Sequence, residues 1–200
     1  MKANIAHTDK QRVVIVGGGL GGLELASKLV DNDFQVVLID KNNYHQFPPL
    51  IYQVASAGLE PSSISFPFRR IFQGKDDFFF RMAKVEAVDT AAKKIQTSVG
   101  EIRYDYLVLA AGAKTNYFGN KDIEATTLPM KTVGEAMRLR NTILRNLEKA
   151  ETEDDPARKQ ALMNIVVVGG GASGVEIAGA VAEMKKNILE RDYPDLEASQ

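Results

Sequence analysis

Two blocks of this chain repeat one pattern of apolar and polar positions. Each block opens with a continuous run of Val and Ile, at residues 13–16 and 165–168, as expected for a parallel strand covered on both faces. A glycine-rich stretch follows, and then apolar residues at helical spacing: Leu23, Leu25, Ala26 and Leu29 in the first block, and Val175, Ile177, Ala178 and Val181 in the second. The pattern predicts a strand, a turn and a helix at 13–30 and again at 165–182.

The two blocks are also alike residue by residue. They align at an offset of 152 with 8 of 18 positions identical. A single G-x-G-x-x-G motif is weak evidence for a nucleotide site, because glycines are common in ordinary turns. Two copies, each after a strand pattern and before a helix pattern, favour dinucleotide binding over a plain strand-turn-helix of an α/β domain.

The glycines that the copies share have separate physical roles. The first permits the tight turn out of the strand, the second leaves room for a pyrophosphate, and the third lets helix and strand pack closely. They are Gly17, Gly19 and Gly22 in the first copy and Gly169, Gly171 and Gly174 in the second. A pyrophosphate would lie on free N–H groups at the helix N-terminus, where the dipole favours an anion.

An acid closes the predicted second strand, residues 34–40. Asp40 lies 18 residues beyond Gly22, near the spacing at which a carboxylate accepts hydrogen bonds from an adenosine ribose. Because it would repel a 2′-phosphate, the first site suits FAD or NAD(H) rather than NADP(H). The alternative is a solvated acid at a strand end.

Residues 41–61 break the periodicity with prolines, an Asn pair and a glycine, and we expect a loop there. Its aromatic and aliphatic residues fit either a satellite core cluster or a wall beside a flat ring system, and the pattern does not choose between them. We interpret His45 as a surface or hydrogen-bonded histidine. The only other histidine is His7, so no metal site is predicted.

Short strand-like segments from residue 78 to residue 112 predict a small antiparallel meander that returns to the main sheet. The last of these segments ends on Ala111, Gly112 and Ala113, which are small enough to let a cofactor approach a strand end.

A capping box at Thr132 and Glu135 then starts a predicted helix whose Arg138, Arg140, Arg145 and Lys149 we interpret as its solvated face. Residues 151–159 read as a charged linker with one proline. The second copy lacks the strand and acid expected after its helix, since the polar segment RDYPDLEASQ stands there. We expect a piece of a longer protein.

The fold class predicted is α/β: a Rossmann-like parallel sheet with helices on both faces, a small antiparallel meander and a truncated second Rossmann unit. The predicted domains are 1–120 for FAD binding, 121–160 for a connecting helix and linker, and 161–200 for the start of an NADH-binding domain.

Composition narrows the function classes. Lys and Arg total 25 against 26 Asp and Glu, a net charge of −1, so no nucleic-acid partner is implied. There is no cysteine, which excludes a redox disulfide or thiolate-bound metal within this sequence. Any redox chemistry here needs a bound cofactor. The polar first twelve residues do not resemble a signal peptide, and the apolar runs are too short for a membrane helix.

Three stretches resemble type II NADH:quinone oxidoreductases, two-dinucleotide flavoproteins of the pyridine nucleotide-disulfide reductase superfamily. Residues 41–72 resemble the H-x-F-x-P-L-x-Y-Q-V-A segment, and YDYLVLAAGA and GGGASGVEIAGA resemble two other signature stretches. The resemblance covers nearly the whole chain. It implies that NADH bound at the second copy passes a hydride to FAD held by the first, and that the electrons continue to a membrane quinone. Disulfide-reducing relatives need a cysteine pair beside the flavin, and a quinone reductase does not.

The resemblance also assigns residues. It places the FAD pyrophosphate on Gly17, Gly19, Leu20 and Gly22, the ribose on Asp40 beside Lys41, and the adenine near the backbone of Lys84 and Val85. It places Phe47 and Pro49 toward the flavin, Ala110, Ala111 and Gly112 beside the cofactor, and NADH on Gly169, Gly171 and Gly174. Glu176 falls at the acid near the nicotinamide–flavin contact, the one catalytic residue implied; a helix first-turn acid is its structural alternative.

Two positions depart from the family pattern, Pro48 and Ala111, where side chains that hydrogen-bond flavin are common. The resemblance further implies a cytoplasmic protein, peripheral on the membrane through a C-terminal region, with NADH preferred over NADPH. We expect the 200-residue chain itself to bind FAD weakly or not at all, to be inactive and soluble, and to be able to form a homodimer through its unfinished edge. Alternatives are a soluble NADH-dependent flavin or ferredoxin-type reductase and a redox-sensing flavoprotein without turnover.

Overall fold

The computed structural model describes residues 3–196, so the last four residues of the RDYPDLEASQ segment lie outside it. The chain forms two compact units. Unit 1 comprises Met1–Phe47 and Ser65–Ala113, and unit 2 comprises Pro48–Ile64 and Lys114–Gln200. This division groups residues 48–64 with the later helices, whereas the sequence-based domains run consecutively. Those domain boundaries concern cofactor binding and stay a prediction.

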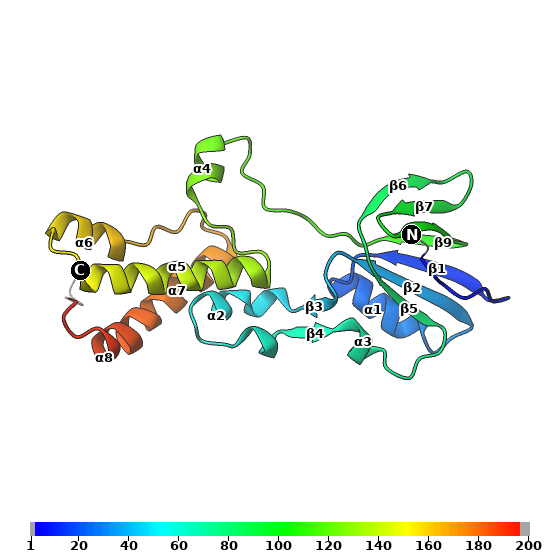
Figure 1. The fold of residues 1–200 in the computed structure, drawn as a ribbon, viewed down its shortest axis with the longest axis horizontal. Helices are drawn as coiled ribbons and strands as arrows, with labels where there is room; N and C mark the ends of the chain where they lie inside the picture. The colour runs from blue at the N-terminus through cyan, green and yellow to red at the C-terminus, as the bar shows by residue number, and fades with distance from the viewer. Residues whose placement is uncertain (1–2, 197–200) are drawn as a thin grey trace. The chain divides into compact units, whose positions relative to one another are not determined.

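Unit 1 is built on a four-stranded parallel sheet (Figure 1). The strand order is β5-β2-β1-β9, so the chain first winds outward from β1 and then returns to its other side. Crevices form at the carboxyl ends of the strands where such an order reverses. The strands are β1 (Gln11–Val16), β2 (Phe34–Asp40), β5 (Phe78–Met82) and β9 (Tyr106–Leu109).

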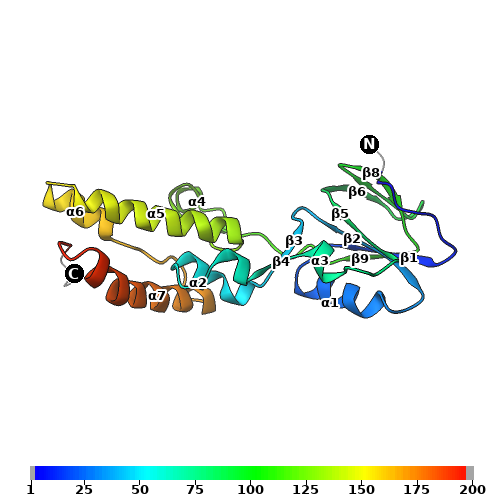
Figure 2. The same cartoon turned by 60° about the horizontal axis from the view of Figure 1, so that its bottom comes forward.

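Different elements pack against the two faces of this sheet (Figure 2). Val13 and Ile15 pack beneath helices α1 (Leu20–Leu29) and α3 (Phe68–Ile71). Val14, on the opposite face, packs against the antiparallel meander. That meander consists of β6 (Val85–Asp89), β7 (Lys94–Thr97) and β8 (Gly100–Arg103). The alternation follows from the two-residue period of a strand.

The α/β fold class and the meander are confirmed, with two differences in detail. The described helices of unit 1 lie on one face of the sheet, and the meander occupies the other. The segment FFFRMAKVEAVD is two strands, because β5 pairs in parallel with β2 and only β6 belongs to the meander.

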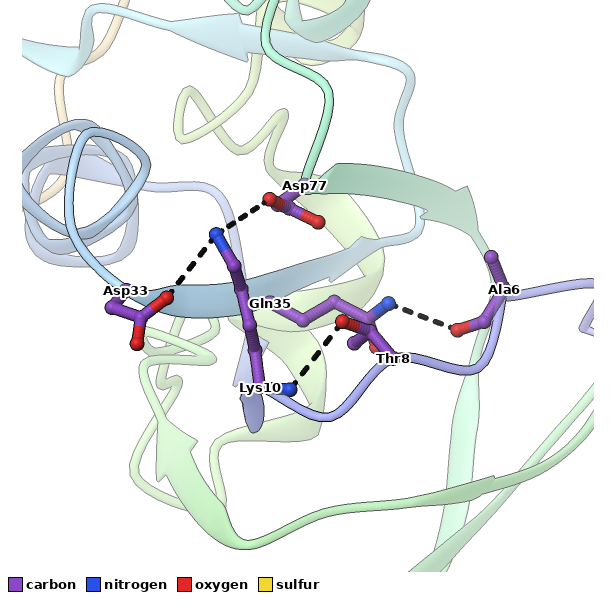
Figure 3. Close-up of polar contacts among 6 residues, drawn as sticks. All are labelled: Ala6, Thr8, Lys10, Asp33, Gln35 and Asp77. Atoms are coloured by element: carbon purple, nitrogen blue, oxygen red, sulfur yellow. Dashed lines mark hydrogen bonds and ion pairs between the residues drawn. The ribbon is translucent and has the colours of Figure 1, made fainter.

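Residues 6–10 of the N-terminal arm are fastened at the edge of unit 1 where the strands begin (Figure 3). The buried Gln35 side chain donates from Nε2 to the carbonyl of Ala6 at 2.9 Å. Lys10 forms ion pairs with Asp77 at 2.9 Å and with Asp33 at 3.3 Å. These pairs raise the pKa of Lys10, chiefly through its hydrogen bond to Asp77.

The expected loop at 41–61 contains regular elements. A two-stranded ribbon in unit 1 joins β3 (Tyr44–Gln46) to β4 (Ser65–Pro67). The remainder in unit 2 forms η1 (Pro48–Leu50), α2 (Ile51–Ala55) and η2 (Pro61–Ser63). Ile51, Val54 and Ala55 are buried in a helical core, which favours the core-cluster interpretation for these three residues.

Unit 2 is helical within the described residues. Its elements are α4 (Lys121–Thr126), α5 (Val133–Glu151), α6 (Pro156–Met163), α7 (Ala172–Met184), the π-helical η3 (Lys185–Leu189) and α8 (Glu190–Asp192). Helix α2 packs against both α5 and α7 (Figure 2). The capping box is confirmed: Glu135 N–H donates to Thr132 Oγ1 at 3.2 Å, and Thr132 N–H donates to Glu135 Oε2 at 2.9 Å.

Three expectations for unit 2 are wrong. Residues 165–168 form no strand in the described chain, since no described strand pairs with them. The charged linker is shorter than predicted, because Asp155 caps α6 and Pro156 occupies its first turn, a standard helix start. Arg140 is half-buried rather than on the solvated face.

Candidate functional site

The first glycine turn, residues 17–22, leaves β1 at the carboxyl edge of the sheet. Gly17 has φ of +104°, a region that side chains disfavour. Its N–H donates to the Ile39 carbonyl of β2 at 2.7 Å. A Cβ at this position would lie 2.3 Å from the carbonyl oxygen of Ala110, directly after β9. Both the dihedral angle and the neighbouring strand therefore require glycine.

The other two motif glycines differ in what surrounds them. A Cβ on Gly22 would lie 1.8 Å from the Gly17 carbonyl oxygen, so glycine is needed for the helix to approach the turn. A Cβ on Gly19 would meet nothing within 4 Å, and its φ of −68° suits any residue. Folding thus explains Gly17 and Gly22 but not Gly19. The open space beside Gly19 is what a bound pyrophosphate would need.

Helix α1 presents unpaired donors to this space. Leu23 donates to the Gly19 carbonyl at 2.9 Å, which is the first helical hydrogen bond of α1. The preceding N–H groups of a helix have no partner within it. Leu20 is 52% exposed, so this end of the helix is open to solvent. Free donors and the helix dipole together favour an anion at this position.

Asp40 lies at the end of β2, beside this turn. Its Oδ2 accepts from the Gly18 N–H at 2.7 Å, and its Oδ1 accepts from the Asn42 N–H at 2.8 Å. A carboxylate offers about four acceptor positions, so a ribose hydroxyl has room to donate as well. The structure therefore gives Asp40 a structural task, and its contact with a ribose stays a prediction. Lys41 beside it is exposed.

Gly18 was missed by the motif analysis, because the motif leaves this position free. It is buried, and a Cβ there would lie 2.1 Å from the ring of the fully buried Phe68. Its carbonyl accepts from Nδ1 of His45 at 2.9 Å. His45 is only 5% exposed, so the hydrogen-bonded interpretation of this histidine is confirmed and the surface one is wrong. The signal available in the sequence was the run of three consecutive glycines, Gly17 to Gly19, of which the motif requires only the first and the last.

Several other predicted residues of unit 1 follow strand ends at the same edge. Ala110 donates to the Val16 carbonyl at 2.8 Å, and the exposed Gly112 has φ of +69°. Ala111 is exposed between them. The unit therefore places residues 110–112 beside the first glycine turn, as a cofactor at that turn requires.

The predicted adenine contacts lie after β5. Lys84 already uses both backbone groups, donating to Ser98 Oγ at 3.0 Å and accepting from the Ser98 N–H at 2.9 Å. Val85 begins β6. Phe47 is 38% exposed, and Pro49 is exposed. Contacts of these residues with a cofactor stay predictions.

The second glycine turn, residues 169–174, reproduces the local geometry of the first. Gly169 has φ of +108°, and Gly171 caps α7 with φ of −75°. A Cβ on Gly174 would lie 2.0 Å from the Gly169 carbonyl oxygen, and one on Gly171 would meet nothing within 4 Å. The first helical hydrogen bond runs from Val175 to Gly171 at 3.1 Å.

Glu176 is an exposed residue of α7. No acid falls in the first turn of this helix, so the alternative that Glu176 merely stabilises the helix start is wrong. The position is free for a functional contact, and the catalytic role stays a prediction.

Between residues 3 and 196, no group of three His, Asp or Glu side chains is arranged to hold a metal ion. Over the same range, no helix has both the length and the apolar character that crossing a membrane requires.

The chain is similar to curated proteins over nearly its whole length. The chain is 35% identical over 195 residues to the type II NADH:quinone oxidoreductase NdhA of Mycobacterium tuberculosis, covering 96% of this chain and 42% of that protein. It is 28% identical over 204 residues to an external alternative NADH-ubiquinone oxidoreductase of Yarrowia lipolytica, of which it covers 35%. The chain thus spans less than half the length of these relatives.

Solved structures of related proteins have a similar fold. The NDH2 of Plasmodium falciparum, determined in complex with NADH, superposes with a TM-score of 0.87 at 26% identity, over 93% of this chain and 39% of that one. The sulfide:quinone oxidoreductase of Aquifex aeolicus superposes with a TM-score of 0.63 over 70% of this chain. Residues 11–193 match the pyridine nucleotide-disulphide oxidoreductase family, and both glycine turns fall within that range. The chain is therefore a member of the pyridine nucleotide-disulphide oxidoreductase family.

Proposed function

We propose that the first glycine turn binds the pyrophosphate of FAD. The observation that carries this proposal is the open space beside Gly19, bordered by the free N–H groups that begin α1. Gly17, Gly18 and Gly22 have folding explanations within unit 1, whereas the open space at Gly19 has none. Asp40 would accept from the adenosine ribose while holding the turn through Gly18. The residues present therefore fit a dinucleotide.

We propose that the second glycine turn binds NADH, because it repeats the same geometry. Relatives of 28–35% identity are named as NADH:quinone oxidoreductases, and NDH2 was solved with NADH. Bound FAD would supply two-electron chemistry, accepting a hydride from NADH and passing electrons to a quinone. The residues of this chain would bind and orient the two dinucleotides, with Glu176 near the nicotinamide. This activity belongs to the full-length protein.

We further propose that the full-length protein reduces a quinone at a membrane surface and forms a homodimer. Quinones dissolve in lipid, so the full-length protein would work at a membrane surface, on its cytoplasmic face. A homodimer is supported by the exposed apolar residues 165–168, of which Val166 is 84% exposed. A preference for NADH over NADPH rests on the names of the bacterial relatives. Comparable kcat/KM values for the two nucleotides would contradict that preference.

A matched pair of substitutions tests the two sites separately. Gly19 and Gly171 both cap a helix with ordinary φ, and a Cβ at either meets nothing within 4 Å, so we expect the fold to accept valine at both positions. In the full-length protein, Gly19→Val should abolish flavin absorbance after purification. Gly171→Val should retain the flavin and raise KM for NADH by at least about tenfold, since it fills only the second space.

The readouts are flavin content at 450 nm and NADH oxidation with a water-soluble quinone. A folded Gly19→Val variant with full flavin content would refute FAD binding at the first turn. Flavin without quinone-dependent NADH oxidation in the unmodified protein would instead favour a different acceptor, so the cofactor and acceptor assignments fail independently.

A further inference from the structure

The peptide groups on both sides of Gly18 are held by side chains. The N–H of Gly18 donates to Asp40 Oδ2 at 2.7 Å, and its carbonyl accepts from His45 Nδ1 at 2.9 Å. The Phe68 ring fills the space where a side chain would stand. Gly18 is therefore fixed from three directions by residues from three different elements.

The local structure explains how these residues reach Gly18. His45 is the middle residue of β3 and pairs with Phe66 of β4. Phe68 begins α3 directly after β4, and its N–H donates to the Asn43 carbonyl at 3.1 Å. The ribbon thus carries His45 and Phe68 together to the first glycine turn. Because a carbonyl only accepts, the His45 ring must carry its proton on Nδ1.

The bond to His45 has a consequence for Gly19. In a trans peptide, the carbonyl of one residue and the N–H of the next point in opposite directions. The Gly18 carbonyl is directed at the buried His45, so the Gly19 N–H must point away from it. Gly19 is exposed and borders the open space at the start of α1. The hydrogen bond therefore sets the direction of a donor at the anion site.

We infer that His45 is a positioning residue for the pyrophosphate: it orients the Gly18–Gly19 peptide so that the Gly19 N–H faces the dinucleotide. The inference rests on the proposed binding of FAD at this turn. A buried carbonyl without a donor is costly, so loss of the imidazole would let this peptide rotate toward another partner. The donors of the anion site would then no longer converge.

Three substitutions isolate the Nδ1 donor. His45→Asn places an amide nitrogen on Cγ, as Nδ1 is placed in histidine. His45→Gln moves that nitrogen one bond farther away, and His45→Leu removes it. The matched control is Gln35→Leu, because Gln35 is also buried and donates to a carbonyl, that of Ala6, at the opposite end of β2 (Figure 3).

The measurements are FAD affinity of the deflavinated full-length protein and the ³¹P resonances of bound FAD. His45→Leu and His45→Gln should weaken FAD by about tenfold or more, the equivalent of one lost buried hydrogen bond, and should shift the pyrophosphate resonances. His45→Asn should restore both. Gln35→Leu should lower the melting temperature and leave FAD affinity and both resonances unchanged.

The results separate FAD binding at the first glycine turn from the positioning role of His45. Unmodified protein that binds no FAD refutes the proposed cofactor and this inference with it. Unmodified protein that binds FAD, together with equal affinity in His45→Leu, refutes the inference alone. Equal weakening by Gln35→Leu, or failure of His45→Asn to restore affinity, also refutes it, because a general loss of stability would then suffice. If His45→Leu does not fold, the Asn and Gln variants decide.

Discussion

The two glycine turns share one local geometry in two different surroundings. In both, the first glycine has φ near +105°, the second caps a helix, and the third contacts the carbonyl of the first. The first turn follows a strand that pairs on both sides, with β2 and β9. The second follows residues 165–168, which have no strand neighbour in the described chain.

The difference lies in what surrounds each turn. Val14 is fully buried, while Val166 at the equivalent position is 84% exposed. A Cβ on Gly17 would strike Ala110, but one on Gly169 would meet nothing within 4 Å. The glycine spacing is therefore sufficient for the turn and the helix start in both surroundings. The strand needs neighbours, because its backbone groups are satisfied only by another strand.

The largest effect is expected from alanine at the first glycine of each turn, in the 200-residue chain. Gly169→Ala should cost about 1–3 kcal/mol of unfolding free energy, the strain of a side chain at this φ. Gly17→Ala carries the same strain plus the clash with Ala110, and should cost about 3–5 kcal/mol when overpacking is added. Urea unfolding followed by circular dichroism measures both. Equal costs would mean that β9 does not constrain the first turn.

Alanine at the third glycine of each turn should cost a similar unfolding free energy in both turns. The contact of Gly22 with Gly17, like that of Gly174 with Gly169, lies inside its own turn. Gly22→Ala and Gly174→Ala should therefore cost about 1–3 kcal/mol each, and similar amounts. The same urea experiment compares them. A much smaller cost for Gly174→Ala would show that the second turn yields because its strand is unpaired.

Equivalent valines test the strands themselves. Val14→Thr buries a hydroxyl among apolar side chains and should cost about 1–3 kcal/mol. Val166→Thr keeps its side chain in solvent and should change stability by no more than about 0.5 kcal/mol. Unfolding of the two variants, side by side with the unmodified chain, gives the values. A large cost at Val166 would indicate that residues 165–168 are covered in solution, as in the proposed homodimer.

The strand, turn and helix of residues 11–29 could be predicted because pattern and neighbours agree: the Val and Ile run of β1 is buried between β2 and β9. The same apolar pattern at residues 165–168 predicted a strand that is not formed, since the pattern reports apolar character and not pairing. The start of α5 could also be predicted, because the side chains of Thr132 and Glu135 form the capping box by hydrogen bonds within the same short segment.

The site was predictable as far as its motif extends. Gly17, Gly19, Gly22 and Asp40 lie together, as their spacing indicated. The roles of His45 and Phe68 at Gly18 could not be predicted, because they depend on contacts across 27 and 50 positions that no periodicity encodes. Short elements such as α2 and β3 were missed for the same reason, since tertiary packing stabilises them more than local propensity does.

The smallest expected effect concerns what holds the helices after the second turn. Tyr193, beyond α8, donates from its hydroxyl to Glu148 Oε1 of α5 at 2.7 Å. This hydrogen bond, with a smaller contribution from burial, raises the pKa of Tyr193 to about 12.

Because the folded pKa lies above the unfolded value near 10, the bond stabilises fully below about pH 10. The stabilisation is lost as pH rises through about 12. The pair is largely open to solvent, so Tyr193→Phe should cost no more than about 1 kcal/mol at pH 8, and the difference from the unmodified chain should shrink steadily between about pH 10 and pH 12. Urea unfolding from pH 8 to pH 12 measures that difference, and the loss of one phenolate transition in the variant locates the pKa. A constant difference across this range would mean that Tyr193 holds α5 by packing and not through its hydrogen bond to Glu148.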